Sequence, residues 1–128
     1  MNSENLPFKI PSPEKRLSYK SLNQRGIELW IKRDDLIHEV VSGNKWRKLK
    51  WNIANAIQNE KDTILTFGGA FSNHIAATAA ASKIHGLKST GIIRGKDADL
   101  ENPTLSGAAR NGMKIQLISR EEFRRIGD

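Results

Sequence analysis

The stretch Asp62–Gly86, DTILTFGGAFSNHIAATAAASKIHG, decides the fold. Thr63–Phe67 is a short apolar run closed by two glycines, which is typical of a buried strand that ends in a tight turn. The alanine-rich segment that follows begins near Ser72, a residue type that caps helices, and stops at Gly86, a residue type that ends them. The stretch therefore predicts a strand, a tight turn and a helix.

The flanking segments repeat this alternation. Leu87–Gly95 predicts a second strand, Asn102–Gly112 a short helix and Met113–Ser119 a third strand. Asn44–Asn59 predicts a helix, because apolar residues recur there at spacings of three and four. These residues are Trp46, Leu49, Ile53 and Ile57. We therefore expect an α/β protein with a parallel sheet, helical crossovers and a three-layer arrangement.

The N-terminal segment differs from the rest of the chain. Residues 1–25 carry three prolines near their start and no clear periodicity, and predict an extended lead-in. Residues 26–128 form the predicted α/β domain, which starts with a strand over Gly26–Arg33. We expect Trp30 of this strand and Trp46 of the first helix to lie in the core.

Length and composition limit the class of protein. A chain of 128 residues with 38% hydrophobic content suits one domain with a modest core. No apolar run approaches the ~20 residues that cross a bilayer, and the N-terminus lacks the layout of a secretory signal. Cysteine is absent, which excludes disulfides and thiolate metal ligands. We expect a cytoplasmic protein with no membrane partner and no metal, and with His38 and His85 at the surface.

The formal net charge of +7 raises the question of nucleic-acid binding. Lysine and arginine are spread along the whole chain, and the densest cluster, at residues 45–50, is explained equally well by a small phosphate-bearing ligand. We expect no nucleic-acid partner, and a basic nucleic-acid module is the weakest of the alternatives.

Lys45 occupies a distinctive position at the start of the first predicted helix. Free backbone N–H groups and the helix dipole place positive charge there, and Lys48 lies three residues further along the same face. Both effects disfavour an ammonium group, and only a neutral amine attacks a carbonyl. Electrostatics alone leaves open a solvated basic helix end.

The Gly68-Gly69 turn is a second candidate site. Two glycines let the backbone turn sharply, and the helix that follows directs its free N–H groups toward an anion. Ser72, Asn73 and His74 lie at this point, where ligands of open parallel sheets bind. No Lys-Ser/Thr pair follows the glycines, so the turn is not a P-loop. A carboxylate or a hydroxyl group suits it better.

Three segments, IKRDDL (Ile31–Leu36), SGNKWRKLKW (Ser42–Trp51) and GGAFSNHIAATAAA (Gly68–Ala81), together carry a resemblance. The chain resembles the N-terminal part of the fold-type II pyridoxal 5'-phosphate enzymes, in the group of 1-aminocyclopropane-1-carboxylate deaminase and D-cysteine desulfhydrase. The resemblance runs from about Pro11 to the C-terminus. It implies a pyridoxal 5'-phosphate cofactor, a small amino acid as substrate, release of ammonia and a 2-oxo acid, and a homodimer in the full-length form.

The resemblance also implies roles for individual residues. Lys45 matches the lysine that binds the cofactor covalently, and Ser72 matches a serine that lies close to the substrate and orients its carboxylate. Asn73 matches an asparagine that contacts the hydroxyl of the cofactor ring. Lys48 matches a lysine near the cofactor phosphate, although a solvent-facing role is an alternative. Arg33–Asp35 belongs to the shared pattern, and we expect it to support the loop and the helix.

The chain also departs from the family pattern. Enzymes of this family are considerably longer, and they bind the phosphate through a glycine-rich loop and the pyridine nitrogen through a residue of a later part. Residues 119–122 have capping-box spacing, so a helix begins just before the chain stops. We therefore expect the first part of a longer enzyme, inactive alone. The alternative is a non-catalytic remnant, or a domain that binds a partner through its unfinished sheet edge.

Overall fold

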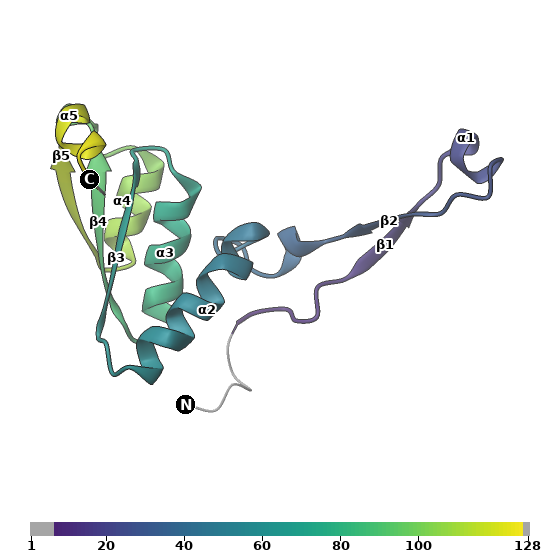
Figure 1. The fold of residues 1–128 in the computed structure, drawn as a ribbon, viewed down its shortest axis with the longest axis horizontal. Coiled ribbons are helices and arrows are strands. Elements are labelled where there is room, and N and C mark those ends of the chain that lie inside the picture. The colour runs from purple at the N-terminus through teal and green to yellow at the C-terminus, as the bar shows by residue number, and fades with distance from the viewer. Residues whose placement is uncertain (1–6, 127–128) are drawn as a thin grey trace.

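The computed structural model describes residues 7–126. They form a body, in which helices pack on a three-stranded sheet, and a two-stranded arm that projects from it (Figure 1). No helix within the described residues has both the length and the apolar character needed to cross a membrane.

The sheet of the body is parallel, with the strand order β3-β4-β5. These strands are β3 (Thr63–Gly69), β4 (Lys88–Arg94) and β5 (Met113–Ile118). Helix α3 (Asn73–Ile84) connects β3 to β4, and α4 (Pro103–Arg110) connects β4 to β5. The predicted α/β fold with a parallel sheet and helical crossovers is therefore confirmed.

The core lies between the sheet and the helices on one of its faces. Ile75 of α3 is fully buried in a cluster with residues of β4, α4 and β5. Burying a side chain of this size contributes about 1.5–3 kcal/mol. A second buried cluster joins α3 to α2 (Asn44–Gln58), whose Leu49 and Ile53 pack against alanines of α3. Helix α2 starts at the predicted residue and ends one residue before the predicted end.

The opposite face of the sheet is largely open (Figure 1). Leu65 and Phe67 of β3 alternate with half-buried and buried residues, and are 57% and 40% exposed. Only one corner meets a helix, where Phe123 of α5 (Arg120–Arg124) lies edge-on to Phe67 with ring centroids 6.5 Å apart. Residues 7–126 thus form two layers, and the expected third layer is not built from them, because no described segment covers this face.

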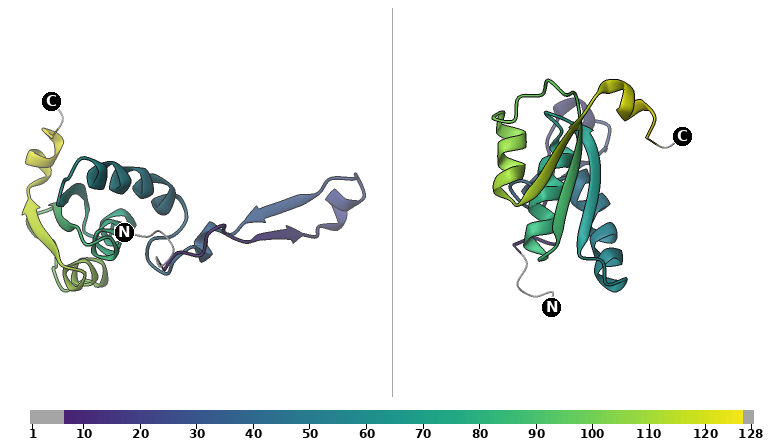
Figure 2. Two further views of the ribbon diagram at one scale, coloured as in Figure 1. Left: turned by 90° about the horizontal axis from the view of Figure 1, so that it is seen from below. Right: turned by 90° about the vertical axis from the view of Figure 1, so that its left-hand side faces the viewer.

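The arm is an antiparallel hairpin of β1 (Glu14–Leu17) and β2 (Leu29–Lys32), with the short α1 (Lys20–Asn23) between the two strands. It extends away from the body in both views that show its length (Figures 1 and 2). Residues 1–25 were expected to form an extended lead-in, and β1, which lies within them, pairs with β2. Trp30 is 55% exposed, so its predicted place in the core is wrong. A strand with alternating apolar residues has the same sequence pattern whether it packs on a core or belongs to a two-stranded arm.

Gly68 sets how closely α3 approaches the sheet. A Cβ atom at this position would lie 2.7 Å from Cγ1 of Ile75, whereas a Cβ at Gly69 would meet nothing within 4 Å. We expect Gly68→Ala to lower the free energy of unfolding by about 1–3 kcal/mol, the usual effect of overpacking a core. Urea unfolding measures this loss, with Gly69→Ala as the matched control. Equal losses in the two variants would contradict the packing argument.

Candidate active site

Lys45 lies in the first turn of α2, as the sequence predicts. The residue before the helix is Gly43, which has a positive φ of 57° and provides no side-chain cap. Glycine adopts this conformation without the steric cost that a Cβ brings. The backbone N–H of Lys45 donates to the carbonyl of Ser42 at 3.1 Å, and its Nζ donates to Oδ1 of Asn44 at 2.9 Å. The amine is therefore held by a neutral acceptor.

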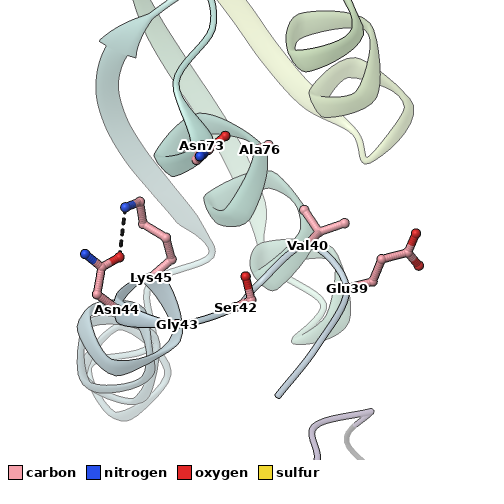
Figure 3. Close-up of a pocket in the computed structure, with 8 residues that line it drawn as sticks. All are labelled: Glu39, Val40, Ser42, Gly43, Asn44, Lys45, Asn73 and Ala76. Carbon is pink, nitrogen blue, oxygen red and sulfur yellow. Dashed lines mark hydrogen bonds between the residues drawn. The ribbon is translucent and has the colours of Figure 1, made fainter. Parts of the chain in front are cut away.

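A hollow of about 560 Å³ brings Lys45 together with Asn73. Figure 3 shows the Lys45 side chain rising from the start of α2 toward the first turn of α3, where Asn73 lies. The other residues of the lining come mainly from the loop before α2. They are Glu39, Val40, Ser42, Gly43, Asn44 and Ala76. Two residues predicted to act on one cofactor thus line one hollow, from two different helices.

Ser72 lines a different hollow, of about 540 Å³, on the other side of the start of α3. Its Oγ accepts the backbone N–H of His74 at 3.2 Å and so caps α3. This second hollow lies at the carboxyl ends of β3 and β4, and Arg94 and Arg120 are among its lining residues. The sequence analysis missed both arginines, although each directly follows or ends a predicted strand, which is the expected place for ligand-binding residues.

His74 reports the electrostatics around Lys45. The imidazole is half-buried, and desolvation lowers its pKa most, followed by the positive charges of Lys45 and then Lys48. His74 is therefore neutral at pH 7. Both amines lie near enough to act on one imidazole, so Lys48 belongs to the same electrostatic environment although it is exposed and does not line the 560 Å³ hollow.

The loop before α2 is fixed by histidine and phenylalanine contacts that the sequence analysis did not foresee. Nδ1 of His38 accepts the backbone N–H groups of Val40 and Val41, each at 3.0 Å. Phe8 packs with its ring centroid 5.3 Å from His38 and 6.2 Å from His85. Both histidines are half-buried, so they lie at the surface but are not freely exposed. Phe8 of the lead-in packs against both.

The donors around Lys45 fit one end of pyridoxal 5'-phosphate. A primary amine suits an aldehyde carbon and a side-chain amide suits a ring hydroxyl, and Lys45 and Asn73 present these two groups at one hollow. Among the ion pairs formed by residues 7–126, none involves Lys45. Within the same residues no group of three histidine or acidic side chains could hold a metal ion.

Comparisons with known proteins give relatives at high identity over most of this chain, and no family model matches it. It is 43% identical over 124 residues to the mitochondrial bifunctional D-cysteine desulfhydrase/1-aminocyclopropane-1-carboxylate deaminase of Arabidopsis thaliana, covering 92% of this chain and 30% of the relative. It is 40% identical over 114 residues to a putative 1-aminocyclopropane-1-carboxylate deaminase of Thermotoga maritima, covering 89% and 35%. The chain therefore spans about a third of the length of these relatives.

Solved structures agree with these relatives. A crystal structure of an ACC deaminase homologue matches with a TM-score of 0.68 and 28% identity, over 88% of this chain and 34% of the other. O-ureido-L-serine synthase matches with a TM-score of 0.61 over 91% of this chain and 35% of the other, but at 14% identity, and this likeness concerns the fold alone.

The position of Lys45 beside His74 predicts a change in titration. Removing the charge of Lys45 with Lys45→Gln should raise the pKa of His74, since its positive charge opposes protonation of the imidazole. Lys48→Gln should raise it by less. NMR titration of the imidazole protons measures both shifts. Lys50→Gln is the control, because the Lys50 amine lies over the ring of Trp51, 4.6 Å from its centroid. If the pKa of His74 is the same in Lys45→Gln as in the wild-type chain, the Lys45 amine and the His74 imidazole are not neighbours.

Proposed function

The chain belongs to the 1-aminocyclopropane-1-carboxylate deaminase and D-cysteine desulfhydrase family and corresponds to the N-terminal part of its members. We propose that it supplies Lys45 as the cofactor-binding lysine of a pyridoxal 5'-phosphate-dependent enzyme. The complete enzyme would release ammonia and a 2-oxo acid from a small amino acid, either 1-aminocyclopropane-1-carboxylate or D-cysteine. One observation carries this proposal: Lys45 and Asn73, which come from different helices, line the same hollow.

Three residues of the chain would hold different groups of the cofactor: Lys45, Asn73 and Lys48. The Lys45 amine would hold the aldehyde end of the cofactor, and the Asn73 amide would hold the ring hydroxyl. Lys48 attracts the phosphate as a positive charge. When bound, pyridoxal 5'-phosphate supplies an electron sink for the bond that breaks at the substrate α-carbon. The Lys45 amine donates a hydrogen bond to Oδ1 of Asn44, and this contact orients the Lys45 nitrogen.

Ser72 orients the substrate carboxylate. Its Oγ accepts the N–H of His74, which leaves the hydroxyl proton free to donate to a carboxylate oxygen. Arg94 and Arg120 line the hollow that Ser72 lines, and their charges attract the same anion. The start of α3 lies between the Lys45 hollow and the Ser72 hollow, and we propose that the substrate is held between them.

A second candidate role, association with another polypeptide, is favoured by the arm. The β1–β2 register places Leu17, Leu29 and Ile31 on one face, together with Lys15 at its edge. The other face carries two ion pairs, Lys32–Glu14 at 3.0 Å and Arg16–Glu28 at 2.8 Å. An isolated two-stranded hairpin is at best marginally stable in water. Covering its apolar face with a second copy of the chain would stabilise it, and this is also how we propose that a homodimer begins.

The cofactor proposal predicts selective modification of Lys45. Protein incubated with pyridoxal 5'-phosphate and reduced with borohydride should carry the label mainly on Lys45, because a half-buried amine held by a neutral acceptor in a matching hollow reacts faster than solvated amines. Chymotryptic peptides analysed by mass spectrometry separate Lys45 from Lys48, since Trp46 lies between them. Lys45→Ala should remove this label and the visible absorption band of the unreduced protein.

The control for this experiment is Lys50→Ala, which removes another lysine of α2 and should leave the label on Lys45 unchanged. Label spread evenly over the lysines, with no effect of Lys45→Ala, would reject the proposed cofactor role.

The arm predicts a different outcome in sedimentation experiments. The chain should sediment as a species larger than a monomer, and the double change Leu29→Asp and Ile31→Asp should return it to a monomer, because charges on the covered face oppose association. Trp30→Lys, on the other face of the same strand, is the matched control and should leave the assembly intact. A wild-type chain that is monomeric at high concentration would exclude this second role.

A further inference from the structure

Asp34 connects three segments that lie apart in the sequence. Its Oδ1 accepts the hydroxyl of Ser12 at 2.6 Å and Nη2 of Arg47 at 2.9 Å, and its Oδ2 accepts Nε of Arg47. Its backbone carbonyl accepts the N–H of Gly43 at 2.8 Å. The Asp34 side chain is only 20% exposed. Asp34 is therefore bound to the lead-in, to the turn before α2 and to the first turns of α2.

Two of these contacts bracket Lys45. Gly43 lies two residues before Lys45 and Arg47 two residues after it, and Asp34 holds both. The helix start between them has no side-chain cap of its own, and the positive φ of Gly43 gives the chain its direction into the helix. Without the contacts of Asp34, the turn at Gly43 and the first turns of α2 no longer share a hydrogen-bonding partner.

We propose that Asp34 is a positioning residue for Lys45, which fixes the amine in the 560 Å³ hollow by binding the backbone before it and the side chain after it. The relevance of this to catalysis rests on the proposed function, whereas the geometry does not. Asp34 touches neither the hollow nor the amine, and acts only through Gly43 and Arg47.

The charge of Asp34 suits this role. The hydrogen bonds from Arg47 and then from Ser12 lower the pKa of Asp34 to about 2, so the carboxylate stays ionised at every pH at which the protein would work. A negative charge beside the start of α2 is also favourable to the helix dipole. The bidentate arrangement with Arg47 restricts orientation as well as distance.

Asp35 is the natural comparison. Its carboxylate pairs with Arg33, two residues away, at 2.7 Å, and both groups belong to the same turn. No hydrogen bond or ion pair among the described residues connects the Asp35 side chain to α2. Asp35→Asn therefore removes a neighbouring carboxylate but leaves the contacts between Asp34 and the start of α2 unchanged.

The test compares Lys45 with Lys48 in the same molecules. Formaldehyde with a borohydride reductant labels amines according to their access, without needing a cofactor site, and chymotryptic peptides report the two lysines separately. In Asp34→Asn the label on Lys45 relative to Lys48 should rise by about fivefold, the size of effect that loss of one ordinary hydrogen bond produces. In the same variant, labelling of Lys45 by pyridoxal 5'-phosphate should fall. The Lys45 amine becomes more accessible to a small reagent, but it is no longer oriented toward the cofactor aldehyde.

Two further variants complete the design. Arg47→Gln removes the other partner at an exposed position and should change both labels in the same direction as Asp34→Asn, even where Asp34→Asn fails to fold. Asp35→Asn should change neither label. Circular dichroism at the labelling temperature confirms that each variant is folded, since unfolding would raise the labelling of Lys45 and Lys48 alike.

The outcomes separate the two proposals. An unchanged ratio of Lys45 to Lys48 in both Asp34→Asn and Arg47→Gln, or an equal change in Asp35→Asn, overturns the positioning role. If pyridoxal 5'-phosphate does not select Lys45 in the wild-type chain while the formaldehyde ratio still responds to Asp34→Asn, the cofactor proposal fails and the positioning role stands.

Discussion

The close approach of α3 to the sheet is the constraint on which the rest of the structure depends. Gly68 leaves room for Ile75, and Ala77, Ala79 and Ala81 are completely buried between neighbouring elements. Small residues let a helix lie close to the strands and to another helix. The start of α3 therefore reaches the end of β3 on one side and the start of α2 on the other, and a hollow forms on each side of it.

The starts of the two helices are held in different ways. Ser72 caps α3 with its own side chain, so the residue proposed to orient a carboxylate is also part of the helix end. The start of α2 has no such cap and depends on Asp34, a residue of a separate turn. Capping by its own side chain keeps Ser72 at the start of α3. Contacts from Asp34, which lies outside α2, fix the start of the helix that carries the long side chain of Lys45.

Apolar periodicity predicts the body of this protein well, because each strand and helix there buries one face. The helix over Asn44–Gln58 and the parallel strands follow from local patterns. The shared hollow of Lys45 and Asn73 does not, since it depends on how α2 packs against α3, and only the family resemblance brought these residues together in advance. The arm and the contacts of Phe8 with His38 were missed because nothing local distinguishes a strand that joins an arm from one that joins a core.

Apolar side chains remain exposed on the arm and on one face of the sheet, and two open hollows lie at the start of α3. The chain spans about a third of the length of its relatives, which therefore have further residues beyond the matched part. Under the proposed function, this chain provides the groups that bind the aldehyde and orient the carboxylate, and Lys48 attracts the cofactor phosphate. The contact to the ring nitrogen belongs to other residues of the complete enzyme.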